Sequence, residues 1–153
     1  MVSPSVIYIG ADHAGFALKE SVRRHLQDKG VDVEDLGAHV LDMNDDYPTY
    51  AARVAGVVRE NPRSLGILVC GSAEGVCIAA NKFDGIRAGI GFSIPAARSL
   101  RNDDDGNVLC LPGRIDVVDK PLAVVDAFID TEFSGEERHE RRVEEISKIE
   151  KAE

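Results

Sequence analysis

Short apolar segments rich in β-branched residues alternate with longer segments of helical periodicity along this chain. The two most apolar segments, VIYIG at residues 6–10 and LGILVC at 65–70, are each followed by a turn that contains glycine. The longer segments repeat apolar residues at helical spacing, as Leu18, Val22 and Leu26 do. Strands that alternate with helices in this way form a parallel sheet joined by right-handed crossovers.

The alternation predicts an α/β fold, a doubly wound three-layer sandwich of Rossmann-like type around a five-stranded parallel sheet. The expected strands lie at 6–10, 31–37, 65–70, 87–92 and 108–111, the second nearer the sheet edge because its apolar residues alternate. The expected helices lie at 16–29, 48–60, 76–82, 95–103, 121–130 and 138–152. The last helix has only a thin apolar stripe, formed by Val143, Ile146 and Ile149, so we expect it to dock on a neighbour.

Length and composition narrow the class of protein. A chain of 153 residues fits a single domain over 1–153, and its formal net charge of −9 disfavours nucleic-acid and anionic-membrane partners. Its three cysteines, Cys70, Cys77 and Cys110, show no zinc-type spacing and indicate reduced thiols, the last two as core residues. The first residues lack the basic segment of a signal peptide. We expect a cytoplasmic protein that needs no metal or other cofactor.

In doubly wound folds, ligands bind outside the carboxyl ends of the strands, which directs attention to the segments after them. GADHAG at 10–15 does not match the dinucleotide-binding glycine pattern. Asp12 is an N-cap candidate, while His13 at a helix start suits an anionic ligand. CGSAEG at 70–75 offers a run of exposed backbone N–H groups, an anion cradle beside the thiol of Cys70. A cysteine at a strand end is otherwise a packing residue.

Basic residues supply further candidates for holding an anion. Arg114 follows the fifth expected strand, and Arg138 and Arg142 lie four residues apart on one helical face. That face either pairs with the neighbouring glutamates in solvent or converges on one anion. A phosphate held by His13, Arg114, Arg138 and Arg142 is chemically reasonable.

Several of these segments occur together in one known family. GADHAGFALKE, DYPTYA (46–51), GILVCGSAEGVCIAANK (66–82), GIRA (85–88) and RHERRVEEI (138–146) resemble, in colinear order, the RpiB/LacAB sugar-phosphate isomerases. The resemblance covers nearly the whole chain. It implies a metal-free isomerase of aldose and ketose phosphates that acts through a cis-enediolate, most simply on ribose 5-phosphate and ribulose 5-phosphate in the non-oxidative pentose phosphate pathway. It also implies a homodimer, sometimes a tetramer, with sites shared between subunits.

The resemblance assigns roles to individual residues. It makes Cys70 the base that removes the C2 proton and Ser72 a hydroxyl that serves ring opening. Another branch of the family uses a glutamate as the base at the position of Val76, so this chain does not belong to that branch. Asp103 falls where the family's ring-opening histidine is expected. His13, Arg114, Arg138 and Arg142 match the phosphate clamp. The expected substrate-binding residues are Asp12, His13, Tyr47, Gly71, Ala73, Glu74, Gly75 and Asp104.

The chain departs from the family pattern at two places. Asp103 and Asp104 replace a His-Asn pair, and Glu74 adds an acid inside the glycine turn. One hypothesis is that Asp103 and Asp104 share a proton, because like charges disfavour joint ionisation. Another is an open-chain substrate such as a tetrose phosphate. The alternatives are therefore the same chemistry on a tetrose or hexose phosphate, a catalytically idle sugar-phosphate-binding module, or, from fold alone, a flavodoxin-like nucleotide or signalling domain.

Overall fold

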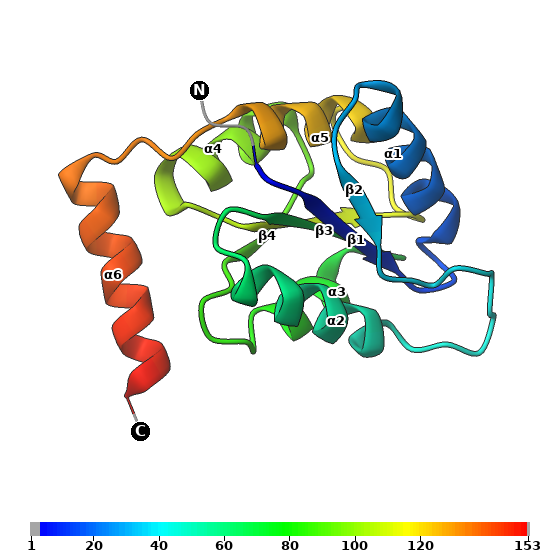
Figure 1. Ribbon diagram of the computed structural model, residues 1–153, viewed down its shortest axis with the longest axis horizontal. Helices are drawn as coiled ribbons and strands as arrows, with labels where there is room; N and C mark the ends of the chain where they lie inside the picture. Colours follow the sequence, from blue (N-terminus) through cyan, green and yellow to red (C-terminus); the bar gives the residue numbers. More distant parts are fainter. Residues whose placement is uncertain (1–3, 153) are drawn as a thin grey trace.

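The computed structural model describes residues 4–152 and confirms the α/β sandwich with a five-stranded parallel sheet. The strands are hydrogen-bonded in the order β2-β1-β3-β5-β4, and every neighbouring pair is parallel (Figure 1). Their bounds are β1 Ile7–Ala11, β2 Val33–Asp35, β3 Leu65–Cys70, β4 Ala88–Ile90 and β5 Val108–Pro112. The expectation of one domain over 1–153 includes residues 1–3 and 153, which lie outside the described residues.

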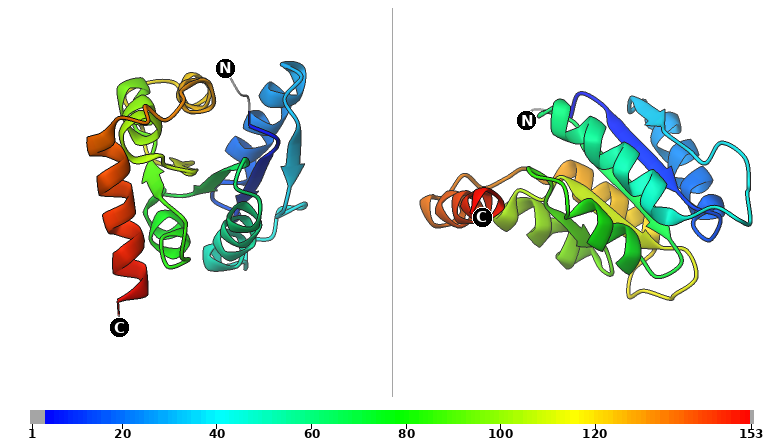
Figure 2. Two further views of the ribbon diagram at one scale, coloured as in Figure 1. Left: turned by 60° about the vertical axis from the view of Figure 1, so that its left-hand side comes forward. Right: turned by 90° about the horizontal axis from the view of Figure 1, so that it is seen from below.

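Helices cover both faces of the sheet. One face carries α1 (Phe16–Asp28), α4 (Ile94–Asp104) and α5 (Pro121–Asp130), and the other carries α2 (Tyr47–Glu60) and α3 (Glu74–Ala80), as Figures 1 and 2 show. β1, β3 and β5 are buried along their whole length. Each face therefore has its own apolar core, and the carboxyl ends of the three central strands meet at one edge of the sheet.

The sixth helix, α6 (Glu137–Lys151), stands beside the β4 edge and contacts α4 (Figures 1 and 2). His139 is buried at this junction, and Glu150 accepts a hydrogen bond from the backbone N–H of Gly85 at 3.0 Å. The stripe predicted to dock on a neighbour is partly open, since Ile149 is 73% exposed. Ile146 is exposed as well, so the described residues leave this stripe partly uncovered.

The observed elements differ from the expected bounds at a few ends. β2 is three residues long because Gly37, with a left-handed φ of 109°, departs from strand conformation. Gly37 and Ala38 nevertheless stay hydrogen-bonded to Ala11 of β1. Among the strands of residues 4–152, the only partner of β2 is β1, as expected of an edge strand. α3 begins at Glu74, earlier than expected, because Ala73 turns the chain through a left-handed φ of 69°.

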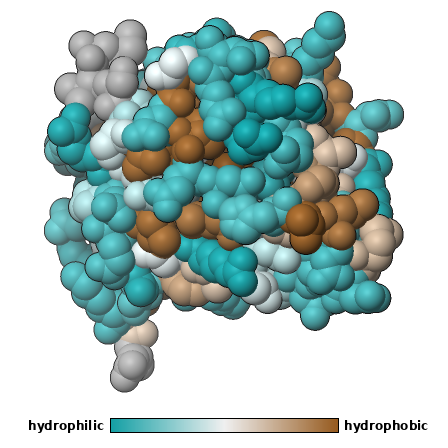
Figure 3. Space-filling model, turned by 45° about the vertical axis from the view of Figure 1, so that its right-hand side comes forward, coloured by the Kyte–Doolittle hydropathy of each residue, from teal (hydrophilic) through white to brown (hydrophobic). Residues whose placement is uncertain are grey.

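The surface is mostly hydrophilic with separate apolar patches, as one face shows in Figure 3. Exposed apolar side chains include Val40, Leu41 and Met43 in the loop after β2. Among residues 4–152, none of the helices combines the length and apolarity that crossing a membrane requires.

Candidate active site

A pocket of about 440 Å³ lies at the carboxyl ends of β1, β3 and β5. Segments that are far apart in the sequence meet there because parallel strands end at the same sheet edge. The pocket is lined by Asp12, His13, Ala14, Tyr47, Cys70, Gly71, Ser72, Glu74, Gly75, Ile78 and Arg114. The structure thus gathers most of the residues that the sequence proposed.

A larger hollow of about 610 Å³ lies at the opposite edge of the sheet. Its two least exposed cations are already engaged. Arg87 donates to Asp105 and to the carbonyl of Asp104, and Arg101 donates to Asp105 and to the carbonyls of Gly106 and Thr131. These contacts join the ends of α4 and α5 to the sheet, so we place the chemistry in the smaller pocket.

The turn after β1 is held tightly against β3. Asp12 is buried, and its Oδ1 accepts a hydrogen bond from the backbone N–H of Gly15 at 3.1 Å. Gly15, which precedes α1, comes so close to β3 that a Cβ there would lie 2.5 Å from the carbonyl carbon of Val69. The N-cap of α1 is Gly15, and among residues 4–152 no side chain caps that helix, so the N-cap interpretation of Asp12 is wrong. Asp12 instead holds the turn before α1 and lines the pocket.

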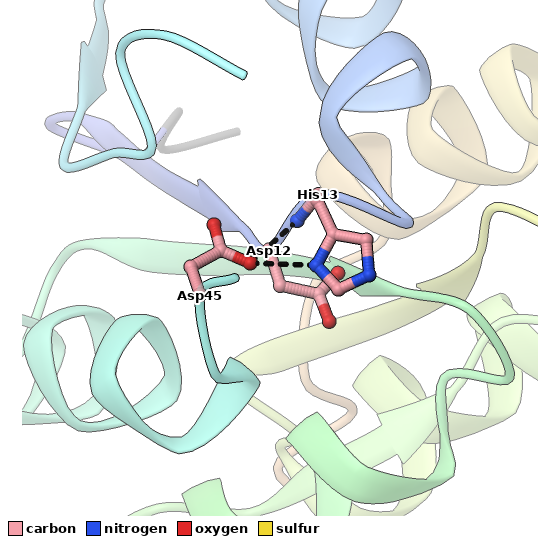
Figure 4. A group of neighbouring side chains, drawn as sticks. All are labelled: Asp12, His13 and Asp45. Carbon is pink, nitrogen blue, oxygen red and sulfur yellow. Dashed lines mark hydrogen bonds and ion pairs between the residues drawn. The ribbon is translucent and has the colours of Figure 1, made fainter. Parts of the chain in front are cut away.

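His13 is the pocket residue with the most defined side-chain bonding. Its ring Nδ1 lies 2.8 Å from Oδ1 of Asp45, which also accepts from the His13 backbone N–H at 2.9 Å (Figure 4). Asp45 lies in the loop before α2 and was not identified from the sequence. No local signal marks it, because Asp42, Asp45 and Asp46 are equally acidic neighbours and the contact spans 32 positions.

Donor atoms of Asp12, His13 and Asp45 all lie within 4.8 Å of one another, which is close enough to hold a metal ion. The bonds already present explain the cluster without one. Asp45 accepts both His13 donors, and Asp12 accepts from Gly15. A buried aspartate next to a hydrogen-bonded imidazole is an arrangement that orients a ring as readily as it binds a cation.

Cys70 is the last residue of β3 and is 4% exposed, at the base of the pocket. The turn after it includes Ala73 in the left-handed conformation, the backbone geometry of anion-binding nests. Ser72 Oγ accepts from the backbone N–H of Glu74 at 3.3 Å. Ala73 itself is fully buried and does not line the pocket, whereas Glu74 is exposed at its rim. Cys70 therefore lines the pocket directly before a polar backbone turn, and it also belongs to the apolar core on the α2 and α3 side of the sheet.

Two residues close the sides of this turn. Tyr47, at the start of α2, packs its ring where a Cβ on Gly75 would lie, only 2.5 Å from the ring carbon Cζ. Arg114 follows β5, and its backbone N–H donates to the carbonyl of Gly71 at 3.0 Å. Glycine at 75 is thus required by the close approach of an aromatic ring, and Arg114 brings an exposed cation to the pocket.

Four predicted site residues lie elsewhere in this chain. Asp103 and Asp104 end α4, while Arg138 and Arg142 are exposed on α6. The structure does not bring them to the pocket. Arg138 instead pairs with Glu136, whose Oε2 lies 2.9 Å from its Nε. A single chain therefore forms only the His13 and Arg114 part of the predicted phosphate clamp.

The hypothesis that Asp103 and Asp104 share a proton is wrong. A hydrogen bond from Asn102 lowers the pKa of Asp103 below its usual value, with a further contribution from Ser99, and burial opposes the shift. His139 lies 3.9 Å away and acts in the same direction. Asp103 is therefore an ionised acceptor at neutral pH, not half of a protonated pair.

Comparison with known proteins gives a consistent result. The sequence profile of the Ribose/Galactose Isomerase family, LacAB_rpiB, matches residues 7–146. A probable ribose-5-phosphate isomerase B of Mycoplasma pneumoniae is 46% identical over 92% of this chain and 91% of that protein. Ribose-5-phosphate isomerase B of Mycobacterium tuberculosis H37Rv is 38% identical over 95% of this chain and 90% of that protein.

Solved structures agree with the sequence comparison. Ribose-5-phosphate isomerase B of Mycoplasma genitalium with bound ribulose-5-phosphate matches with a TM-score of 0.91 and 42% identity, covering 97% of both chains. The Clostridium thermocellum enzyme matches with a TM-score of 0.89 and 39% identity, covering 95% of this chain and 97% of that one.

Proposed function

The chain belongs to the ribose/galactose isomerase family, and on that premise we propose that it interconverts ribose 5-phosphate and ribulose 5-phosphate. The relatives named above are ribose-5-phosphate isomerases B, and one of them was solved with ribulose-5-phosphate bound. The observation that carries the proposal is a single pocket lined by Cys70, by the polar backbone turn that follows it, and by His13 and Arg114. This arrangement offers a proton acceptor and an anion site in one cavity.

The reaction moves two protons and leaves the atoms otherwise unchanged. Cys70 takes the proton from C2 of the open-chain aldose, which gives the cis-enediolate, and returns it to C1 to give the ketose. The hydroxyl proton moves from O2 to O1 in the same sequence. Backbone N–H groups of the 71–75 turn stabilise the enediolate oxygen, whose charge exists only along the reaction path. Ser72 serves the same oxygens as a hydroxyl donor and acceptor.

The remaining pocket residues hold the substrate. Asp12 and Tyr47 contact sugar hydroxyls, and His13 and Arg114 bind the phosphate. Arg138 and Arg142 of a second copy complete the clamp, because in one chain they lie on α6, away from the pocket. The open apolar stripe on that helix supports a homodimer with shared sites. Three free cysteines suit the cytoplasm, the compartment we propose.

A second candidate is the same chemistry on a sugar phosphate that is already open-chain, such as a tetrose phosphate. The observation that favours it is the ionised Asp103 in the position where the family resemblance expects a ring-opening histidine. A carboxylate with a lowered pKa is a poor general acid at neutral pH.

A coupled assay with ribose 5-phosphate, a tetrose phosphate and a hexose phosphate tests the proposal. Turnover of ribose 5-phosphate with the highest kcat/KM supports the proposed function, and a higher value for the tetrose phosphate supports the second candidate. The Cys70→Ala variant serves as the matched blank for contaminating isomerase. Wild-type protein that shows no more turnover than this blank on any of the three sugars contradicts both.

A further inference from the structure

Asp45 does not line the pocket itself, but it contacts His13, which does (Figure 4). Its side chain is 6% exposed although most of its loop is open to solvent. Oδ1 accepts two hydrogen bonds from His13, one from the backbone N–H and one at ring Nδ1. A buried carboxylate is costly unless it is bonded, so these two contacts explain why Asp45 stays inside.

The electrostatics of Asp45 fit this role. Burial raises its pKa and the hydrogen bonds from His13 lower it, with a net downward shift that keeps the carboxylate charged. Tyr50 adds a smaller contribution to this lowering, and both hydrogen bonds that reach Oδ1 of Asp45 come from His13. The charge of Asp45 is therefore directed chiefly at His13.

The bond to Nδ1 determines which ring nitrogen is free. In Figure 4, Nδ1 of His13 faces Asp45 and the second nitrogen, Nε2, lies on the far side of the ring. When Nδ1–H donates to Asp45, Nε2 is the nitrogen left to face an anion, and it donates to that anion when the ring is the doubly protonated imidazolium. A carboxylate that fixes the tautomer and orientation of an imidazole in this way is a recurring device in proteins.

We propose that Asp45 is a positioning residue, which holds the His13 ring so that Nε2 is presented to the phosphate of the sugar. The inference rests on the proposed function, since it deepens the phosphate site of the same pocket. The alternative is that Asp45 only anchors its loop. An anchor affects stability, whereas a positioning residue affects the affinity of the pocket for phosphate.

Kinetics of three variants separate these roles. Asp45→Ala removes the acceptor, Asp45→Asn keeps a neutral acceptor, and Asp42→Asn removes the same charge from an exposed residue of the same loop. For Asp45→Ala we expect KM for ribose 5-phosphate and the inhibition constant of inorganic phosphate to rise about tenfold, the size of one charge-assisted hydrogen bond, with kcat nearly unchanged. Asp45→Asn changes both constants less, and Asp42→Asn leaves them at wild-type values.

A spectroscopic measurement makes the test independent of turnover. Nitrogen-15 NMR of the imidazole, assigned with His13→Gln, reports which ring nitrogen carries the proton. We expect the Nδ1–H form in the wild-type protein and in Asp45→Asn, and a mixture of tautomers in Asp45→Ala. Titration with inorganic phosphate should add a proton at Nε2 of wild-type His13, because only the imidazolium can donate to Asp45 and to the phosphate at once.

Three outcomes overturn the inference: a wild-type ring protonated on Nε2 only, unchanged phosphate inhibition in a folded Asp45→Ala, or an equal change in Asp42→Asn. If Asp45→Ala does not fold, Asp45→Ser replaces it, and the wild-type tautomer still decides. A protein that binds phosphate through His13 but does not isomerise sugars contradicts the proposed function and leaves the role of Asp45 intact.

Discussion

The residues that the sequence assigns to one site lie in two separate regions of the structure, and these regions are built in different ways. The pocket at the carboxyl edge collects Asp12, Cys70 and Arg114 from three strand ends of a single chain. The corner between α4 and α6 contains Asp103 and Arg138. It lies near the start of β4, where Arg87 donates a hydrogen bond to the carbonyl of Asp104. In the first region side chains converge on an empty space, whereas in the second they pair with local neighbours.

The difference follows from chain direction. Each helix of a doubly wound fold runs back against its strand, so α4 ends at the edge of the sheet opposite the pocket. Residues at a helix C-terminus therefore cannot reach a site at the carboxyl edge of their own sheet. If both regions serve one reaction, the second region of one copy must act in the pocket of a different copy.

The largest effect that we expect tests the first region alone. Cys70→Ala should lower kcat at least about 100-fold, because it removes the group that takes the C2 proton. Cys77→Ala is the matched control, since that thiol is half-buried on α3 and packs against the core on this side of the sheet. A Cys70→Ala protein with near-normal turnover in the coupled assay would remove the thiol from the mechanism.

Alkylation adds a readout that does not depend on turnover. A hydrogen bond with Cys110 lowers the pKa of Cys77, so iodoacetate should modify Cys77 as well as Cys70. Cys110 is fully buried and its pKa is raised by burial, so it should stay unmodified. Substrate should protect Cys70 only, and peptide mass mapping measures this. Protection of Cys77 instead would place the ligand elsewhere.

The second prediction asks whether the two regions form one site. Neither the Cys70→Ala nor the Arg142→Ala protein should be active alone, yet mixing them should restore part of the activity through hybrid dimers. One hybrid site then has Cys70 from one copy and Arg142 from the other. Sedimentation and mass spectrometry verify the exchange of subunits. Exchanged but inactive mixtures would show that the two regions do not share a site.

The sequence predicted the pocket region better than the corner, for a physical reason. Strand periodicity locates strand ends, and topology then brings Asp12, Cys70 and Arg114 together without knowledge of side-chain contacts. Asp45 lies in an irregular loop, and no periodicity relates it to His13. Asp103 accepts hydrogen bonds from Ser99 and Asn102. Neither the periodicity of the sequence nor the family resemblance determines which of the nearby polar groups it bonds to.

A third and smaller effect tests how closely the pocket is packed. Gly75→Ala places a Cβ 2.5 Å from the Tyr47 ring, so the ring must move and KM should rise about tenfold. Gly56→Ala on α2 is the matched control because a Cβ there meets nothing within 4 Å. The control should keep wild-type kinetics and gain about 0.5–1 kcal/mol of stability, measured by thermal unfolding. Wild-type KM in Gly75→Ala would show that the position of Tyr47 does not matter to binding.

The smallest expected effect concerns the corner. Asp103 is an ionised acceptor, so it cannot supply a proton for ring opening near neutral pH. The double substitution Asp103→His with Asp104→Asn restores the family pattern and places an imidazole, with a usual pKa of about 6.5, at that position. If the corner acts in the pocket of a second copy, activity on ribose 5-phosphate should rise about threefold or more relative to an open-chain tetrose phosphate.

The tetrose phosphate is the internal control, because it undergoes the same proton transfer at C2 without a ring to open. A general loss of folding or of Cys70 function lowers both activities together and leaves their ratio unchanged. The substitution also removes the acceptor of the hydrogen bonds from Ser99 and Asn102, which costs about 1 kcal/mol of stability, so thermal unfolding is followed in parallel. An unchanged ratio in a folded variant would mean that the end of α4 takes no part in ring opening, whatever the arginines of α6 contribute. A changed ratio, together with recovery in the mixing experiment, would join the two regions in one site.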